Sequence, residues 1–259
     1  HTDRADTYKG LAIPADSRAR RRIVEKAGEV CLKGFVTGQP LPDERMRRVE
    51  RIAWIEAEEM LQPDRIFTAI EEVVVKEGFD GATVEKIAER IGMSKSSLYF
   101  YFRNKDEMFG KAVEREKAHF ASLAHQRLRF LDGFEEKLYA LFLMMAAYAT
   151  NNPTQLTVMN WLRYRNVQVG KPRRALERIR DLFAFVEEAR RNGGLRTPEG
   201  SSFSLALFPN FLVTREVLQE GFSARSMEER TAVLRRLYRL FENGVAPTRN
   251  ETDLAGRIA

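Results

Sequence analysis

The chain of 259 residues contains one cysteine, Cys31, and only three histidines. One cysteine excludes an intrachain disulfide framework and a cysteine metal cluster, and it favours a reducing compartment. Glu116 and His119 have the Glu-x-x-His spacing of carboxylate-bridged metal bundles, but a second copy of that motif is missing. His125 does not share a helix face with His119. We therefore expect no metal ion and no cofactor.

Glycine-rich phosphate loops are absent from the sequence, and so is a pairing of cysteine with histidine for nucleophilic catalysis. The sequence also lacks an apolar run of ~18 residues, the length that a membrane-spanning helix needs, and shows no signal peptide. These absences argue against an enzyme and against a membrane protein. A cytoplasmic location is the simplest expectation.

Hydrophobic residues make up 44% of the chain, which is enough for a substantial core and compatible with two domains. Helix formers dominate and β-branched runs are scarce, so the predicted fold class is all-α. The formal net charge of +6 permits a nucleic-acid partner without proving one.

Residues 65–109 carry the pattern of three short helices and the start of a fourth. Apolar residues recur at helical spacing in the first helix, which we expect to stop at Gly78. Thr83 is placed to cap the second helix, and Ser94 is placed to cap a short third helix after the break at Gly92. Two helices joined by a tight turn that contains glycine form a helix-turn-helix, whose second helix can enter a DNA major groove.

The segment from Ala88 to Phe102, followed by Asn104-Lys105-Asp106-Glu107, resembles the DNA-binding domain of the TetR (tetracycline repressor-like) family of transcriptional regulators. The resemblance implies an N-terminal helix-turn-helix domain and a larger helical domain for ligand binding and dimerisation. Ser96 stands where this family often has Gly, and Phe100 stands where it often has Tyr or His.

The resemblance assigns DNA contacts to the helix that follows Ser94 and phosphate contacts to the starts of two flanking helices. Hydroxyl and N–H groups at a helix start suit a phosphate oxygen, and lysine and tyrosine reach phosphates or base edges. The alternative is that the aromatic residues only build a small core, which we favour for Leu98 and Phe102. The predicted DNA-binding residues are Thr83, Ser94, Lys95, Ser96, Tyr99, Tyr101 and Lys105.

Residues 1–62 form an N-terminal extension that the resemblance does not cover. Helical patterns are expected over residues 17–35 and 43–61, with a proline-containing break at 38–42. In one interpretation, the arginines at 18–22 form a basic arm that follows DNA beside the recognition helix. In the other, which we prefer, the two helices bury their apolar stripes on the body or on a second subunit.

The helices between residues 109 and 191 contain a surplus of Phe, Met, Trp and Tyr. By resemblance this region houses the ligand, and methionine with aromatic residues suits an adaptable apolar cavity. The alternative for each single residue is an ordinary place in the core. The predicted ligand-binding residues are Phe142, Met145, Tyr148, Met159, Trp161 and Phe183, and the expected ligand is small and apolar or amphipathic.

Two final helices are expected, one over residues 202–220 and one after the capping box of Ser226 and Glu229. Their apolar residues cover more than one face, so one side is expected to meet the body and another side a second chain. A symmetric dimer would read a palindrome with a fixed half-site spacing. The predicted dimer-interface residues are Phe203, Leu207, Phe211, Leu218, Leu234, Leu237 and Phe241.

The predicted domains are the extension 1–62, the helix-turn-helix domain 63–109, the ligand-binding and dimerisation domain 110–247, and a tail 248–259. We expect a homodimeric repressor that a small ligand releases from double-stranded DNA. The alternative is a helical interaction or scaffold protein in which the helix-turn-helix is only structural.

Overall fold

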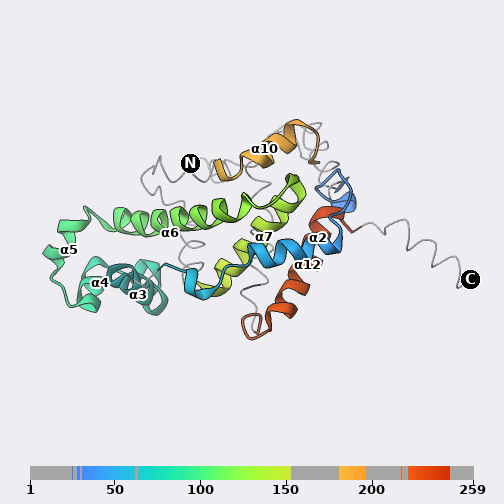
Figure 1. Ribbon diagram of the computed structural model, residues 1–259. Helices are drawn as coiled ribbons and strands as arrows, with labels where there is room; N and C mark the ends of the chain where they lie inside the picture. Colours follow the sequence, from blue (N-terminus) through green and yellow to red (C-terminus); the bar gives the residue numbers. More distant parts are fainter. Residues whose placement is uncertain are drawn as a thin grey trace, which may run out of the picture.

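The computed structural model describes residues 25, 28, 29, 31–61, 64–152, 181–196, 217 and 221–245. Helices dominate this part of the chain, and its β pairing is limited to one antiparallel bridge between Val36 and Leu195. The all-α prediction is confirmed. The elements labelled in Figure 1 and the short turn η2 are α2 (Asp43–Ala53), η2 (Ala57–Glu59), α3 (Arg65–Gly81), α4 (Val84–Ile91), α5 (Lys95–Tyr101), α6 (Lys105–Leu128), α7 (Gly133–Asn151), α10 (Ala184–Arg191) and α12 (Met227–Asn243).

The described residues form two hydrophobic cores, and the long helix α6 runs from one to the other (Figure 1). The smaller core lies among α3, α4, α5 and the start of α6, where Ile70, Ile87, Leu98 and Phe109 are 1% exposed or less. The larger core includes α2, α7 and α12. Within the described ranges, each helix is too short or too polar to span a lipid bilayer.

Helix α2 packs on α7 because its apolar residues fall on one stripe. Met46, Val49 and Ala53 recur at helical spacing, and all three are 0% exposed. For this helix, the preferred interpretation of the extension holds: the apolar stripe is buried on the body of the same chain. The arginines at 18–22 lie outside the described residues.

The predicted helix over 43–61 was too long. The chain leaves the helical conformation at Trp54, whose φ of −61° and ψ of 134° are extended. A single turn, η2, follows, and the side chain and backbone of Glu56 exchange capping hydrogen bonds with Glu59. Tertiary contacts explain why α2 ends early. The carbonyl oxygens of the extended residues Trp54 and Ile55 accept hydrogen bonds from Arg127 on α6 and Asn151 on α7, and the chain runs along these helices towards the smaller domain.

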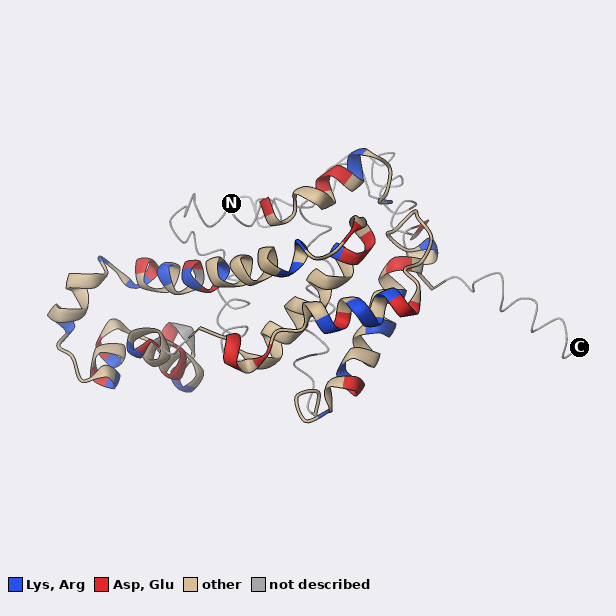
Figure 2. Cartoon of the chain, in the orientation of Figure 1, with Lys and Arg blue, Asp and Glu red and all other residues tan. Residues whose placement is uncertain are grey.

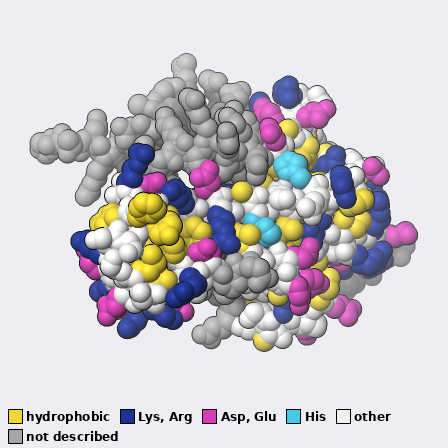
Figure 3. All heavy atoms as spheres, turned by 60° about the vertical axis from the view of Figure 1, so that its left-hand side comes forward, with side chains coloured by type: hydrophobic (Ala, Val, Ile, Leu, Met, Phe, Trp, Pro, Cys, Tyr) yellow, Lys and Arg dark blue, Asp and Glu magenta, His cyan; other side chains and the backbone are white. Residues whose placement is uncertain are grey.

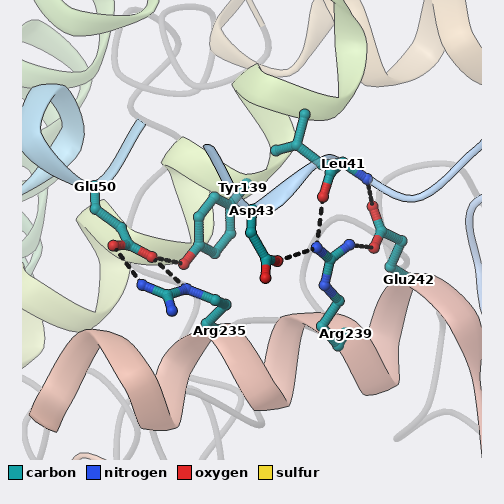
Figure 4. A network of polar contacts seen from close by, with 7 residues as sticks. All are labelled: Leu41, Asp43, Glu50, Tyr139, Arg235, Arg239 and Glu242. Carbon is teal, nitrogen blue, oxygen red and sulfur yellow. Dashed lines mark hydrogen bonds and ion pairs between the residues drawn. The ribbon is translucent and has the colours of Figure 1, made fainter. Parts of the chain in front are cut away.

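A partly buried ion pair joins α2 to α12, and a hydrogen bond joins α2 to α7 (Figure 4). The Glu50 carboxylate accepts hydrogen bonds from the Arg235 guanidinium at 2.8 and 2.9 Å and from the Tyr139 hydroxyl at 2.8 Å. Burial and the Glu50 charge raise the pKa of Tyr139, so this hydroxyl stays a donor. These contacts satisfy a carboxylate that would otherwise be costly to bury.

A second set of ion pairs lies further along α12 in the same view (Figure 4). Arg239 donates to Asp43 at 2.7 Å and to Glu242 at 2.6 Å. Glu242 also accepts the backbone N–H of Leu41 at 2.8 Å. The extension is therefore fixed to the last described helix by charged hydrogen bonds as well as by apolar packing.

Candidate nucleic-acid interface

Helix α4 is the supporting helix of a helix-turn-helix. Its N-cap is Thr83, whose hydroxyl accepts the N–H of Lys86 at 3.3 Å, as the sequence predicted. Its C-cap is Gly92, with φ of 72° and ψ of 32°, a left-handed conformation that suits glycine. The buried stripe consists of Val84, Ile87, Ala88 and Ile91.

Upstream of α4, the expected stop of the first helix at Gly78 is a kink. Gly78 has φ of 70° and ψ of 168°, and one more helical turn follows it. The N–H of Ala82 then bonds the Gly78 carbonyl oxygen at 2.9 Å. This turn brings the chain to Thr83, where α4 begins.

Helix α5 begins at a serine cap and is held by one buried face. The Ser94 hydroxyl accepts the N–H of Ser97 at 3.0 Å. Leu98 and Phe102 are 1% and 8% exposed, which confirms their predicted place in the core. Because these two residues turn inward, the opposite side of α5 faces outward.

The outward side of α5 carries most of the predicted DNA-binding residues. Tyr99 is 43% exposed, Tyr101 is 53% exposed and Phe100 is 87% exposed. Figure 3 shows hydrophobic side chains gathered at this end of the molecule, with Lys and Arg side chains around them. The exposed members of the prediction are Thr83, Ser94, Lys95, Ser96, Tyr99 and Tyr101.

Lys95 is the one charged residue of α5, and it forms an ion pair with Glu85 on α4. Its ammonium group lies 5.7 Å from the centre of the Tyr99 ring. The hydrogen bond to Glu85, followed by charge attraction, raises the pKa of Lys95. Lysine stays protonated here, and the exposed pair can open to a competing anion at little cost.

The predicted flanking lysine, Lys105, lies at the start of α6 and is half-buried. Its ammonium group lies 5.7 Å from the centre of the Phe109 ring, and burial lowers its pKa despite the nearby charges of Asp80 and Asp106. Lys111, one turn and a half along α6, donates to the carbonyl oxygen of Tyr101 at 3.2 Å. Sequence reasoning did not single out Lys111, because the contact depends on how α6 leaves the domain.

Acidic and basic residues are interspersed along α3 and α4 (Figure 2). Lys86 pairs with Glu77 at 2.7 Å, and Arg90 pairs with Glu72 at 2.6 Å. These cations are shared with carboxylates of the same domain. A contact with DNA phosphates therefore depends on side-chain placement more than on the net charge of the domain.

Residues 66–112, which run from α3 into α6, match the family model described as bacterial regulatory proteins, tetR family. This segment of the chain is similar to the TetR family of transcriptional regulators. Tetracycline repressor protein class A from transposon 1721 of Escherichia coli is 37% identical over 54 residues, which are 21% of this chain and 25% of that protein. The negative transcriptional regulator IcaR of Staphylococcus epidermidis is 38% identical over 39 residues, 15% of this chain and 21% of that protein.

The chain therefore spans a quarter or less of these two curated TetR-family relatives. A solved structure, the transcriptional regulator FadR from Bacillus subtilis in complex with stearoyl-CoA, matches with a TM-score of 0.54 at 17% identity. The match covers 70% of this chain and 98% of that one, and it shows that the fold is shared. Both curated relatives are named as a repressor or a transcriptional regulator, so the matched segment is similar to parts of proteins that regulate transcription.

A second connection links the TetR-type DNA-binding domain to the body, besides α6. The segment before α3 is tied to α6 and α7 by hydrogen bonds. The ring of His119 donates to the carbonyl oxygen of Glu59 at 2.7 Å, Arg127 donates to the Glu59 carboxylate at 2.6 Å, and Asn151 donates to the carbonyl oxygen of Ile55 at 2.9 Å. These hydrogen bonds fasten residues 55–59 of the N-terminal extension to the larger domain.

The Glu-x-x-His motif noted in the sequence has separate protein partners. Glu116 is 5% exposed and accepts a hydrogen bond from the hydroxyl of Tyr148, while His119 contacts Glu59. Burial raises the pKa of Tyr148, with a further contribution from Glu116, so the hydroxyl remains protonated. Both side chains of the motif therefore help to pack α6 on its neighbours.

The predicted ligand-binding residues that the structure describes do not all lie together. Phe142 is 1% exposed, and its ring centre lies 5.8 Å from that of Tyr238 on α12. Tyr148 faces α6, where its ring centre lies 5.4 Å from that of Phe120. Met145 and Phe183 are partly buried against the larger core. Met159 and Trp161 lie outside the described residues.

The dimer-interface prediction needs a correction on α12. Leu234 is 0% exposed and Phe241 is 4% exposed within the single chain, so they are core residues and form no surface for a second subunit. Phe241 stacks on Phe35, with ring centres 4.6 Å apart. The extension covers a face that the periodicity alone assigned to a partner. Leu237 is partly buried, and Phe203, Leu207, Phe211 and Leu218 lie outside the described residues.

Proposed function

We propose that the protein is a ligand-responsive repressor that binds a palindromic operator as a homodimer. The observation that carries this proposal is the orientation of α5. Its buried side chain, Leu98, fixes the helix on the domain, and its hydroxyl-bearing and aromatic side chains face outward. A helix presented in this way has the shape that enters a major groove.

The proposed contacts follow from the position of each side chain. Lys95 and Tyr99 lie on one side of α5, where they reach phosphates or base edges once Lys95 leaves Glu85. Ser96 and Tyr101 are exposed on the same helix. Ser94 has its hydroxyl engaged with Ser97, so its proposed role is mainly to hold the start of α5.

Two flanking positions are proposed to contact phosphates. Thr83 is exposed at the start of α4, and Lys105 is half-buried at the start of α6. Phosphate contacts fix the register of a protein on DNA, and they carry no sequence information by themselves. Thr83→Ala and Lys105→Ala are therefore expected to weaken binding to all sequences by similar factors.

The larger domain is proposed to bind the effector. Its proposed contacts are Phe142, Met145 and Tyr148 on α7, Phe183 before α10, and also Met159 and Trp161. Their apolar character supports an apolar or amphipathic ligand, and the B. subtilis FadR structure with this fold holds stearoyl-CoA. The ligand lowers operator affinity by no more than its differential affinity for the two conformations of the protein.

The dimer is proposed to form through the last two helices, with Phe203, Leu207, Phe211, Leu218 and Leu237 as contributors. Leu234 and Phe241 are no longer part of that surface. A twofold pair of α5 helices would then read two half-sites, and dimer geometry would set the distance between them.

An electrophoretic mobility shift with the DNA upstream of the gene tests the proposal. Wild type is expected to bind one fragment specifically. Lys95→Ala is expected to weaken binding with a smaller salt slope if it contacts a phosphate, whereas Tyr99→Ala is expected to relax the sequence preference. Lys76→Ala is a matched control, because the Lys76 side chain is 82% exposed on α3. Absence of specific binding would favour the scaffold alternative.

The effector is sought separately. A thermal-shift screen with apolar and amphipathic compounds, a long-chain acyl-CoA among them, is expected to find a compound that stabilises the protein. The same compound is expected to displace the bound operator. A compound that stabilises the protein without displacing the operator would contradict the proposed ligand response. The proposed DNA binding would be unaffected by that result.

A further inference from the structure

Phe100 is the most exposed large hydrophobic residue in the described part of the chain, at 87%. It lies on α5, two residues after the buried Leu98. An α-helix turns by about 100° per residue, so Phe100 points to nearly the opposite side of the helix from Leu98. Ser96 shares this outermost side, one turn earlier and with a small side chain. Phe100 is therefore the side chain of α5 that projects furthest from the domain.

A phenylalanine that projects from a recognition helix makes apolar contacts with DNA rather than hydrogen bonds. Its ring has no hydrogen-bond donor or acceptor, so it cannot take over the role of a tyrosine or histidine hydrogen bond. In the major groove, the apolar feature at a base edge is the C5-methyl group of thymine, and Phe is among the residues that contact it. The neighbouring Tyr101 ring packs edge-on against the Phe100 ring, with the ring centres 5.6 Å apart, and this contact helps to orient Phe100.

The surroundings of Phe100 favour DNA as the occupant of this apolar face. Lys95 lies on the same helix, and Lys111 lies against the carbonyl oxygen of Tyr101. Figure 3 shows Lys and Arg side chains bordering the hydrophobic patch. Cations that flank an apolar tip match a groove whose edges are phosphates and whose floor carries methyl groups.

We propose that Phe100 reads a thymine in each half-site of the operator through its C5-methyl group. This inference rests on the proposed function and makes it more specific, since it names a base that the operator must contain. Ser96, small and on the same side, lets the helix come close enough for the ring to reach the base edge.

The test uses the full chain and replaces thymine with uracil, which removes the methyl group and keeps the hydrogen-bonding edge. An operator is first selected from random DNA with the wild-type protein. Each thymine is then replaced symmetrically in both half-sites, and dissociation constants are measured by fluorescence anisotropy at one salt concentration. At one position, wild type is expected to lose about fourfold in affinity for each half-site, which corresponds to burial of one methyl group.

Three variants identify the residue responsible. Phe100→Ala is expected to bind the thymine and uracil operators equally, and Phe100→Leu is expected to retain part of the discrimination. Val75→Ala removes another exposed apolar side chain, 62% exposed on α3, and is expected to discriminate like wild type. Since Phe100 is exposed, its substitution is expected to leave the thermal unfolding curve unchanged.

The outcomes distinguish failure of the thymine contact from failure of the proposed function. A selected operator that tolerates uracil at every position, or that lacks thymine in its half-sites, overturns the inference while the proposed function stands. The same holds if Phe100→Ala discriminates as strongly as wild type. If no DNA sequence is selected at all, the proposed function fails and this inference fails with it.

Discussion

Gly34 and Gly244 lie backbone to backbone where the first described segment meets the end of α12. A Cβ atom on Gly244 would overlap the backbone nitrogen of Gly34, and a Cβ atom on Gly34 would overlap the carbonyl oxygen of Glu242. Both residues have positive φ, 75° and 73°. The close approach lets Phe35 donate its N–H to the carbonyl oxygen of Phe241 at 2.8 Å.

Gly34→Ala is expected to destabilise the protein strongly, by about 3–5 kcal/mol, because backbone strain and overlap with main-chain atoms add. Chemical denaturation followed by circular dichroism measures the free energy of unfolding. Gly38→Ala is the control, since its Cβ would meet only the flexible Glu135 side chain, at 3.3 Å. Equal losses in the two variants would contradict the close approach.

The Glu50–Arg235 pair is expected to couple the extension to α12. Arg235→Ala leaves Glu50, only 7% exposed, without its charged partner, and is expected to lower the free energy of unfolding by about 2–4 kcal/mol. Adding Glu50→Gln is expected to cost much less than it does in wild type, with a coupling of about 1–3 kcal/mol in a double-mutant cycle. Arg236→Ala, an exposed arginine on the same helix, is expected to change stability by less than about 0.5 kcal/mol. Additive losses would show that the pair contributes nothing.

Stability is expected to depend on pH through Glu136, a carboxylate on α7 that is 0% exposed. Burial alone would raise its pKa, but hydrogen bonds from Arg45 at 2.8 Å and from the N–H of Asp132 at 3.0 Å outweigh it and lower the pKa below 4.5. A lowered folded-state pKa stabilises the protein above pH 4.5, and this contribution is lost as the pH falls through the folded-state value. The stability difference between wild type and Glu136→Gln should therefore shrink on acidification, as measured by urea unfolding on both sides of pH 4.5. A difference that does not vary with pH would be inconsistent with this.

The pKa of Glu242 on α12 is shifted in the opposite direction to that of Glu136. Burial raises its pKa above 4.5, and the hydrogen bonds from Leu41 and Arg239 offset this only in part. A raised folded-state pKa means that ionisation costs stability as the pH rises past the unfolded value. Glu242→Gln, which resembles the protonated side chain, is therefore expected to gain stability relative to wild type as the pH rises through 4.5. If Glu242→Gln instead gained stability relative to wild type as the pH fell, the ion pair with Arg239 would outweigh burial and lower the pKa of Glu242.

Release of Lys95 from Glu85 is expected to strengthen DNA binding. Glu85→Gln frees the ammonium group for a phosphate and is expected to raise affinity for any DNA by no more than about fivefold, since exposed ion pairs are weak. Fluorescence anisotropy at low salt measures the change. Glu77→Gln removes an equal charge from the Lys86 pair and is the matched control. Equal gains in both variants would attribute the effect to net charge alone.

Local sequence determined much of the DNA-binding domain, because capping and periodicity act over a few residues. The caps at Thr83 and Ser94 form as predicted, and Leu98 is buried as predicted; outside this domain, the predicted cap at Ser226 also forms. These features depend on hydrogen bonds between neighbours in the chain. They can be read from the amino-acid order without knowledge of the rest of the fold.

Only the tertiary structure decided which surface each apolar stripe meets. Periodicity identified the apolar faces of α2 and α12, but it could not show that α7 and residues between 35 and 50 contact α12, or that Leu234 and Phe241 belong to the larger core. Likewise, the pairing of Glu136 with Arg45 joins residues 91 positions apart. A helix exposes the same stripe whether its partner belongs to its own chain or to another, so the identity of that partner depends on long-range packing.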